Sequence, residues 1–298
     1  SRPSALPSCG GIEMISRAST PDARLIISMP PQEGKALGLD TPIATPSGWS
    51  TMGELRAGDR VFDRFGRPCR VTWVSPVWDG RPCYTVRTGD GEAIVADAAH
   101  EWIARLDRRR CERIVETSLL SKQRSKHAQI VGPPSLHLPE ADLPVDPYVL
   151  GAWLGDGHTT QAMLTCADMP IVDRIRAAGV PCREATGRYA WSLAPAVRSS
   201  KTSPIRRALT AIGVWGNKHI PVQYLRSSPS QRLALLQGLV DTDGYVMPKG
   251  QVEVCTTSDR LARDVQHLVF TLGAKATINI GRATIDGRDC GPKYRVRF

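Results

Sequence analysis

Two stretches of the chain share one design: VLGAWLGDG at residues 149–157 and LQGLVDTDG at residues 236–244. Each is a mainly apolar run that contains small residues and ends in Asp-Gly. Helices with small residues on one face can pack closely, because no bulky side chain separates their backbones. We therefore expect the two runs to pair as helices and to bring their final acids, Asp156 and Asp243, together.

A pair of neighbouring carboxylates suits a metal ion. Two carboxylates held close repel each other unless a cation lies between them. Oxygen ligands with open positions for water are typical of Mg²⁺, and such a site stabilises both the attacking and the leaving oxygen of a phosphodiester. The alternative is that each Asp-Gly is a turn that closes a buried helix. One copy favours the turn, whereas two copies inside a structural repeat favour the metal site.

The surrounding sequence predicts an α+β fold in two parts. Residues 36–103 contain short β-prone runs separated by turn pairs such as Ser47-Gly48, which indicates a β-rich unit with several hairpins. Residues 104–146 are first basic and then Pro-rich, which predicts a linker or boundary. From residue 147 the pattern predicts an α/β unit with an internal α-β-β-α-β-β repeat.

Composition narrows the class of protein. The 298 residues are enough for about two domains. The net charge of +10 favours a nucleic acid as partner, and a basic protein without such a partner stays an equal alternative. The sequence has no run of 18 apolar residues, no secretory signal and no C-x-x-C pair among its eight Cys. We therefore expect free thiols, a cytoplasmic location and no membrane association.

The motif at 236–244 resembles the signature of LAGLIDADG (dodecapeptide, DOD-type) homing endonucleases. The motif at 149–157 is similar but looser, with Leu154 where the signature has an acid. The resemblance covers about residues 147–298 and implies that Asp156 and Asp243 are catalytic ligands of Mg²⁺. Asn217-Lys218-His219-Ile220-Pro221 resembles the Lys-x-Ile-Pro stretch of intein-borne members, which implies a catalytic role for Lys218. The alternative for Lys218 is a solvated loop lysine.

The β-rich part resembles an intein, the Hint-type domain of protein splicing. DTPI, SGW and MGELRAGDRVFD are similar to the N-terminal block of inteins, and GEAIVADAAHEWI to the block with the splicing histidine. Asp97 and His100 match that block, so His100 is expected to activate the scissile amide; a half-buried structural His is the alternative. Ala36 has no nucleophile and Trp102 follows His100, as in inteins that lack the first nucleophile. Their internal Cys and terminal His-Asn are expected beyond Phe298.

The segment before Ala36 resembles a nucleotide-binding loop. SMPPQEGK, residues 28–35, is similar to the P-loop of a phage terminase large subunit, with Gly34 and Lys35 as its nucleotide-binding residues. A P-loop continues with Ser or Thr, because that hydroxyl ligates Mg²⁺. Here an intein that begins at Ala36 would interrupt the loop, so the missing residue would join Lys35 after excision. The alternative is a chance Gly-Lys turn.

These observations predict three segments: a host (N-extein) flank at 1–35, the N-terminal part of a splicing domain at 36–135, and an endonuclease at 136–298. The expected function is site-specific, Mg²⁺-dependent double-strand cleavage of DNA at intein-less alleles by a monomer. Two saddle-shaped sheets would read the major groove. Splicing is not expected from this chain alone, although a C-terminal intein fragment could act in trans. The alternatives are a degenerate DNA-binding or structural insert, and a non-functional terminase fragment.

Overall fold

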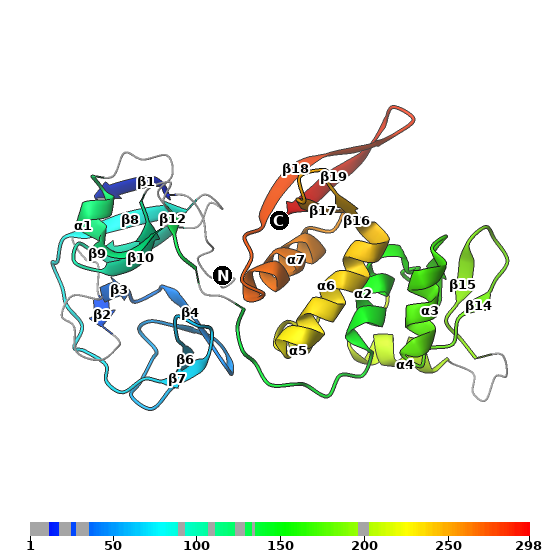
Figure 1. Ribbon diagram of the computed structural model, residues 1–298, viewed down its shortest axis with the longest axis horizontal. Helices are drawn as coiled ribbons and strands as arrows, with labels where there is room; N and C mark the ends of the chain where they lie inside the picture. Colours follow the sequence, from blue (N-terminus) through cyan, green and yellow to red (C-terminus); the bar gives the residue numbers. More distant parts are fainter. Residues whose placement is uncertain are drawn as a thin grey trace. The chain divides into compact units, whose positions relative to one another are not determined.

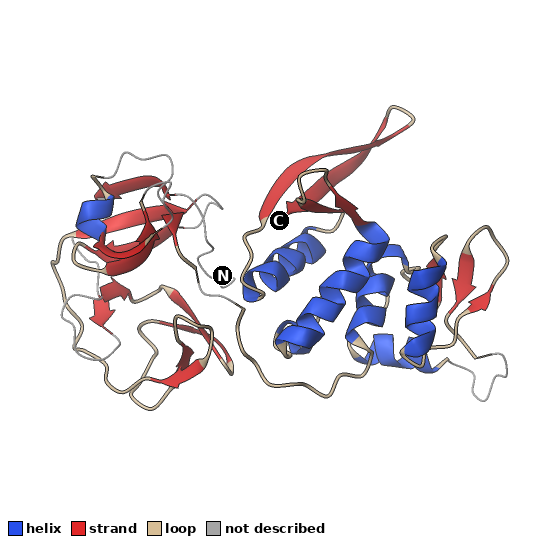
Figure 2. Ribbon diagram, viewed as in Figure 1, coloured by secondary structure: helices blue, strands red, loops and turns tan. Residues whose placement is uncertain are grey.

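The computed structural model describes residues 12–17, 25–27, 36–88, 93–106, 111–122, 129–132, 135–195 and 203–298. The chain divides into two compact units, Ser1–His137 with Gly273–Lys275 and Leu138–Leu272 with Ala276–Phe298 (Figure 1). In the described residues, the first unit consists of strands and one short helix, whereas the second combines helices with two small sheets (Figure 2). The predicted α+β class is therefore observed.

The first unit is built from short antiparallel strands. They are β1 (Ile12–Arg17), β2 (Leu25–Ile27), β3 (Ala36–Gly38), β4 (Pro42–Thr45), β5 (Gly48–Thr51), β6 (Arg60–Phe62), β7 (Pro68–Arg70), β8 (Cys83–Thr88), β9 (Ala93–Asp97), β10 (Glu101–Arg105), β11 (Glu112–Glu116) and β12 (Gln129–Ile130). One sheet has the order β1-β8-β9-β3-β2 and another β11-β10-β12, while β4-β5 and β6-β7 are two-stranded. β3 therefore pairs with β9, although the sequence between them forms other strands. This pairing places residues near Ala36 beside residues near Asp97.

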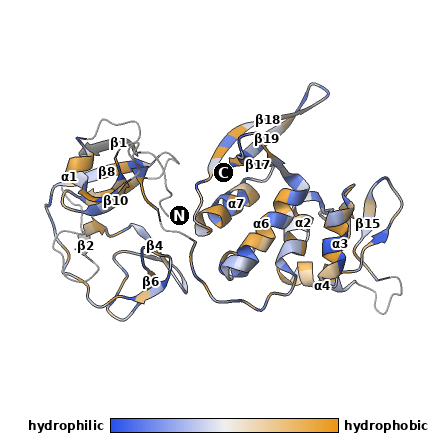
Figure 3. Ribbon diagram, viewed as in Figure 1, coloured by the Kyte–Doolittle hydropathy of each residue, from blue (hydrophilic) through white to orange (hydrophobic). Residues whose placement is uncertain are grey.

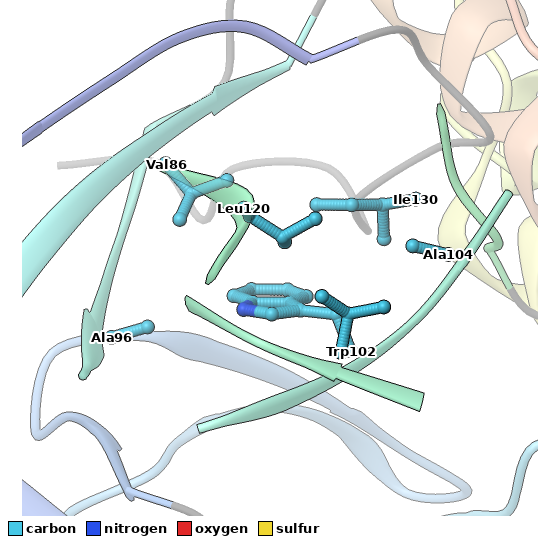
Figure 4. Close-up of a cluster of buried hydrophobic side chains, with 7 residues drawn as sticks. Val86, Ala96, Trp102, Ala104, Leu120 and Ile130 are labelled. Carbon is cyan, nitrogen blue, oxygen red and sulfur yellow. The ribbon is translucent and has the colours of Figure 1, made fainter. Parts of the chain in front are cut away.

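Two apolar clusters hold this unit. In the first, Trp102 of β10 packs with Val86, Ala96 and Ile130, together with Leu120 of the helix α1 (Thr117–Leu120) (Figure 4). The second cluster joins residues of the β6–β7 region, namely Met52, Leu55, Val61 and Val71. Figure 3 shows the corresponding hydrophobic colouring on β8, β10 and α1.

Residues 104–146 were predicted to be a linker or boundary. The boundary between the two units does lie in this range, after His137, but the first part of the range is not a linker. This range contains β11, α1 and β12, because Val115 pairs with Trp102 across the strands and is buried in the same cluster. The strand also exposes Ile114 and charged residues on its other face, since side chains alternate along a strand.

The second unit contains the helices α2 (Pro147–Asp156), α3 (Met169–Ala177), α4 (Pro204–Ala211), α5 (Val222–Leu225), α6 (Pro229–Asp243) and α7 (Asp259–Thr271). The helices α2 and α6 begin in the same way, with a side-chain cap followed by proline. Asp146 accepts a hydrogen bond from the Val149 amide, and Ser228 forms a capping box with Gln231. These caps fix where each motif helix starts. None of the described helices combines the length and the apolar character that crossing a membrane requires.

The two halves of this unit have related but unequal sheets. The strands are β13 (Met163–Thr165), β14 (Arg183–Glu184), β15 (Ala190–Ser192), β16 (Gly244–Val246), β17 (Val252–Thr256), β18 (Thr277–Ile285) and β19 (Arg288–Arg297). The first sheet has the order β13-β15-β14 and the second β16-β17-β19-β18. In place of a counterpart to β16, the first half has a single bridge between Gly157 and Leu164. The predicted α-β-β-α-β-β pattern is thus complete only in the second half.

Candidate functional site

The helices α2 and α6 lie in direct backbone contact, and glycines make this contact possible. A Cβ atom added to Gly151 would overlap the carbonyl oxygen of Leu235, and one added to Gly238 would overlap the carbonyl oxygen of Tyr148. At Gly155 an added Cβ would overlap the side chain of Thr242. The small residues noted in the sequence therefore face the partner helix. The two helices pack along their length and end side by side (Figure 1).

The two acids occupy equivalent positions at the ends of these helices. Asp156 is the last residue of α2 and Asp243 the last of α6, and the amide of the following glycine bonds to the carbonyl four residues earlier in both cases. Gly157 and Gly244 have extended backbones, with φ of −71° and −97°. Each Asp-Gly pair therefore closes a largely buried helix, an ending that both the metal site and the helix-closing turn require. Each glycine is needed because a Cβ would overlap the preceding turn of its own helix.

The charges of Asp156 and Lys218 affect the protonation of Asp243. Burial, followed by the charge of Asp156, raises the pKa of Asp243 to about 6, against the lowering effect of Lys218. Burial also raises the pKa of Asp156, and Lys218 again opposes the shift. These effects of one charge on another require that the three charged groups lie close together. The structure thus brings together the three residues predicted for catalysis.

Lys218 is held in place rather than freely solvated. Its Nζ donates a hydrogen bond to the carbonyl oxygen of Gly155, with a distance of 2.8 Å. Burial lowers the pKa of Lys218, while the charges of Asp243 and Asp156 oppose that change. The loop that carries it is anchored to α7, because the amide of Ile220 donates to the carboxylate of Asp264 at 3.0 Å.

A pocket of about 520 Å³ opens beside these groups. Lys218 and Asp243 line it together with hydroxyl and backbone groups around the start of α7. The remaining lining residues are Leu154, Gly155, Thr159, Gly216, Asn217, Cys255, Thr256, Thr257, Ser258 and Leu261. A pocket that combines an ammonium, hydroxyls and a carboxylate can accept a phosphate group and a cation.

The donor set fits a hard divalent cation. Asp156 and Asp243 offer carboxylate oxygens, which Mg²⁺ prefers, with other positions open to water or phosphate. The raised pKa of Asp243, due in part to the charge of Asp156, indicates a repulsion that a cation would relieve. Among the described residues, no group of three or more His, Cys, Asp and Glu is placed to hold a metal. The residues present therefore fit Mg²⁺ with two protein carboxylates, rather than a metal enclosed by protein ligands.

A second group of predicted residues gathers in the first unit. Leu37 of β3 lies opposite Ala96 of β9, so the antiparallel register continues to Ala36 opposite Asp97. The amide of His100 donates to the carbonyl of Asp97 at 3.0 Å. The rings of His100 and Trp102 lie edge to face, with centroids 4.7 Å apart. The structure therefore brings together the four residues predicted for splicing.

Contacts within this group explain why His100 and Asp97 are fixed. Asp97 is 1% exposed and lies 2.9 Å from the Nε of Arg81, an ion pair that the sequence did not indicate. The indole of Trp102 donates to Thr117, whose hydroxyl donates in turn to the carbonyl of His100. These contacts are compatible with both roles considered for His100, in splicing and in structure. Gly34 and Lys35, predicted for nucleotide binding, lie outside the described residues.

Sequence reasoning missed two aromatic contacts of the motif helices. Tyr148 donates to Asp241 at 2.8 Å, and the guanidinium of Arg174 lies 3.7 Å from the centre of its ring. Trp153 stacks on Trp215. The aromatic residues inside an apolar run were visible in the sequence, but their partners come from α3 and from the loop after α4.

Comparison with known proteins finds a family match in the C-terminal part. Residues 230–294 match the LAGLIDADG-like domain. This match confirms the motif predicted at 236–244 and covers α6, α7 and most of the second sheet.

The chain is also 38% identical over 303 residues to the replicative DNA helicase DnaB of Mycobacterium intracellulare, which includes 93% of this chain and 49% of the helicase. DnaB of Mycobacterium leprae is 41% identical over 91 residues, or 30% of this chain and 15% of that protein.

Solved structures of similar sequence include the MchDnaB-1 intein, with 51% identity over 23% of this chain and 53% of that chain, and a TM-score of 0.23. The Msm DnaB1 intein splicing domain bound with zinc is 49% identical over 26% of this chain and 59% of that chain, with a TM-score of 0.24. This chain spans about half the length of the first helicase it resembles.

The predicted phage terminase host is wrong, because the similarity that extends over 93% of the chain is to DnaB helicases. A P-loop is a poor guide to the host, since the same phosphate-binding backbone serves many classes of NTPase. The comparisons also give no support to the predicted type of intein, the one that lacks a first nucleophile.

Proposed function

We propose that the second unit is a DNA endonuclease of the homing type, carried by an intein inside a DnaB-like helicase. The observation that carries the proposal is the pair of acids, Asp156 and Asp243, at the ends of two helices in backbone contact, with Lys218 beside them. The LAGLIDADG-like domain at 230–294 supports it, because that family consists of nucleases. Both acids come from one chain, so a monomer supplies the whole site.

Each residue has a defined task in this proposal. Asp156 and Asp243 hold a divalent cation, which we propose to be Mg²⁺; when bound, it activates water and stabilises the leaving oxygen of a phosphodiester. Lys218 places a positive charge beside the phosphate, and its hydrogen bond to Gly155 keeps the ammonium at the end of α2. The pocket beside Lys218 and Asp243 offers room for the phosphate group next to both residues.

DNA recognition is assigned to the two sheets. Basic residues project from their hairpins, including Arg188 beside the β14–β15 turn and Arg288 beside the β18–β19 turn, both exposed. Contacts of Arg with phosphates position a protein on the duplex, and contacts with base edges give it specificity. A protein with a net charge of +10 is suited to such a polyanion. Since both relatives are mycobacterial helicases, the proposed location is the bacterial cytoplasm.

A cleavage assay tests the function directly. The full chain is incubated with a plasmid carrying an uninterrupted DnaB-type helicase gene, with Mg²⁺ or with EDTA. We expect a linear product with Mg²⁺ and none with EDTA. The control plasmid carries the same gene with the intein sequence in place, which interrupts the target and should remain uncut. Specific binding without cleavage in Mg²⁺ would show a degenerate, DNA-binding insert instead.

A second function is proposed for the first unit, as the N-terminal part of a splicing domain. The arrangement of Ala36 opposite Asp97, with His100 and Trp102 adjacent, favours it. Ala36 carries no thiol or hydroxyl, so it cannot attack the preceding peptide bond. We therefore expect the Lys35–Ala36 bond to stay intact when the purified chain is incubated with or without a thiol, as followed by mass spectrometry. Spontaneous cleavage at this bond would show a nucleophile elsewhere and would remove Ala36 from the proposed site.

A further inference from the structure

A series of stacked side chains links the surface of the second unit to Lys218. The guanidinium carbon of Arg206, on α4, lies 5.1 Å from the centre of the Trp215 ring. Trp215 stacks on Trp153 of α2, with centroids 6.3 Å apart and an angle of 10° between the rings. The Nζ atom of Lys218 lies 5.4 Å from the centre of the Trp153 ring. Trp153 therefore contacts both the second indole and the ammonium.

Packing alone sets the orientation of Trp153. Its side chain is only 1% exposed, and its Nε1–H finds no acceptor within the described part of the chain. A buried indole usually donates a hydrogen bond. Without one, packing holds the plane of the ring, and the stack on Trp215 is part of that packing. A change in the stack would therefore change the surface that Trp153 offers to Lys218.

Two groups of α2 hold the ammonium of Lys218. The carbonyl oxygen of Gly155 accepts its proton at 2.8 Å, and the face of Trp153 lies on the preceding turn. The face of an indole attracts a cation because its quadrupole is negative there. Burial disfavours the charged lysine, whereas Asp243, Asp156 and the indole all favour it. The ring thus adds an attraction that acts on the position of the ammonium as well as on its charge.

We propose that Trp153 is a positioning residue for Lys218: stacked on Trp215, it holds the ammonium against the end of α2 and directed toward the two acids. The predicted effect on cleavage rests on the proposed endonuclease function. The placement of the lysine does not, because it can be measured without DNA.

Chemical labelling of Lys218 tests the placement. An acylating reagent reacts with the neutral amine, so the pH dependence of labelling, followed by peptide mass spectrometry on the full chain, reports the charge of Lys218. In Trp153→Leu we expect labelling at a fixed pH to be about threefold to tenfold faster and its midpoint to move to lower pH, since an attraction for the ammonium is lost. Trp153→Phe keeps a weaker π face and should lie between Leu and Trp. Lys249, in the turn between β16 and β17, serves as the internal reference.

The same variants are then assayed for cleavage. We expect the rate at neutral pH to fall about fivefold in Trp153→Leu, with the dissociation constant for DNA within about twofold of the wild type. Unchanged labelling of Lys218 in a folded Trp153→Leu protein would overturn the proposal, whatever the cleavage rate. Altered labelling together with a wild-type chain that never cuts DNA would support the positioning role and refute only the endonuclease. If Trp153→Leu does not fold, Trp153→Phe decides by the same criterion.

Discussion

The two halves of the second unit are alike at their helices and different at their sheets. The helices α2 and α6 have the same kind of cap, contact each other through glycine and end in an acid followed by an extended glycine. The sheet of the first half has strands of two or three residues, whereas β18 and β19 of the second half have nine and ten. The residues proposed for cleavage therefore lie on the helices, where the two halves are alike. The residues proposed for DNA recognition lie in the sheets, where the two halves differ.

The acids themselves are similar in position but unequal in environment. Burial raises the pKa of both, but Asp243 also responds to the charge of Asp156 and reaches about 6. The two acids thus occupy equivalent positions but differ in their protonation. Asp156 ionises more easily, and Asp243 keeps its proton to a higher pH. The predictions below ask how far the likeness of the halves extends.

The largest expected effect is a loss of stability when a glycine in the contact between α2 and α6 is replaced. Gly151→Ala and Gly238→Ala each place a Cβ against a backbone carbonyl of the partner helix, which cannot move aside as a flexible side chain would. We expect each change to lower the free energy of unfolding by about 3 kcal/mol, and by similar amounts in the two halves. Denaturant unfolding of the full chain measures it. Gly281→Ala is the control, because its Cβ would make only ordinary contact with Lys293, and it should be nearly neutral.

If Gly238→Ala were as stable as the wild type, the backbone contact between α2 and α6 would be wrong. A large loss for one glycine alone would show that the two halves do not share the contact equally.

The next effect is on the pH dependence of metal binding. Asp243 binds a proton as the pH falls through about 6, and the protonated acid is a poor ligand. We expect the affinity for Mg²⁺, measured by calorimetry, to fall about tenfold per pH unit below 6. Asp156→Asn removes the neighbouring charge, so the ¹³C carboxyl signal of Asp243 should titrate at lower pH in that variant.

The ionisation of Asp243 also makes the free energy of unfolding depend on pH. The pKa of Asp243 is higher in the folded protein than its ordinary value of 3.8, so the folded state binds the proton more tightly. Without metal, this acid therefore adds stability as the pH falls from about 7 toward 4. An Mg²⁺ affinity that stays constant down to pH 5 would contradict the placement of Asp243 in the metal site.

The smallest effect compares the two sheets. Arg188 and Arg288 are exposed residues beside the hairpin turns of the first and the second sheet. If both sheets contact phosphates, Arg188→Gln and Arg288→Gln should each reduce the slope of log affinity against log salt by about 0.9. The change is measured by fluorescence anisotropy with the target duplex over a range of salt concentrations. A change for Arg288→Gln alone would assign DNA binding to the longer sheet only.

Local patterns in the sequence predicted the helix pair and its acids well. Small residues within two apolar runs, each ending in Asp-Gly, were enough to expect that Asp156 and Asp243 meet, because close packing of helices follows from side-chain size. The alternation of β-prone runs and turns likewise indicated the β-rich first unit. These features depend on residues close together in the sequence.

Features that depend on distant residues could not be predicted. The basic stretch before residue 130 was expected to be a linker, but Val115 and Ile130 join the Trp102 cluster through strand pairing. The stack of Trp153 on Trp215 and the ion pair of Asp97 with Arg81 also join segments whose proximity only the fold determines. The host was misassigned for another reason, since a phosphate-binding loop is common to many proteins.

The most direct test of the account is DNA cleavage by Asp156→Asn and Asp243→Asn. Each change removes one proposed metal ligand, so we predict that either variant loses at least about a thousandfold in cleavage rate while its affinity for the target duplex is retained or slightly increased. Asp241→Asn is the matched control, because this nearby acid bonds to Tyr148 and should leave cleavage close to the wild type. Cleavage at the wild-type rate by Asp156→Asn would contradict the paired site at the ends of α2 and α6.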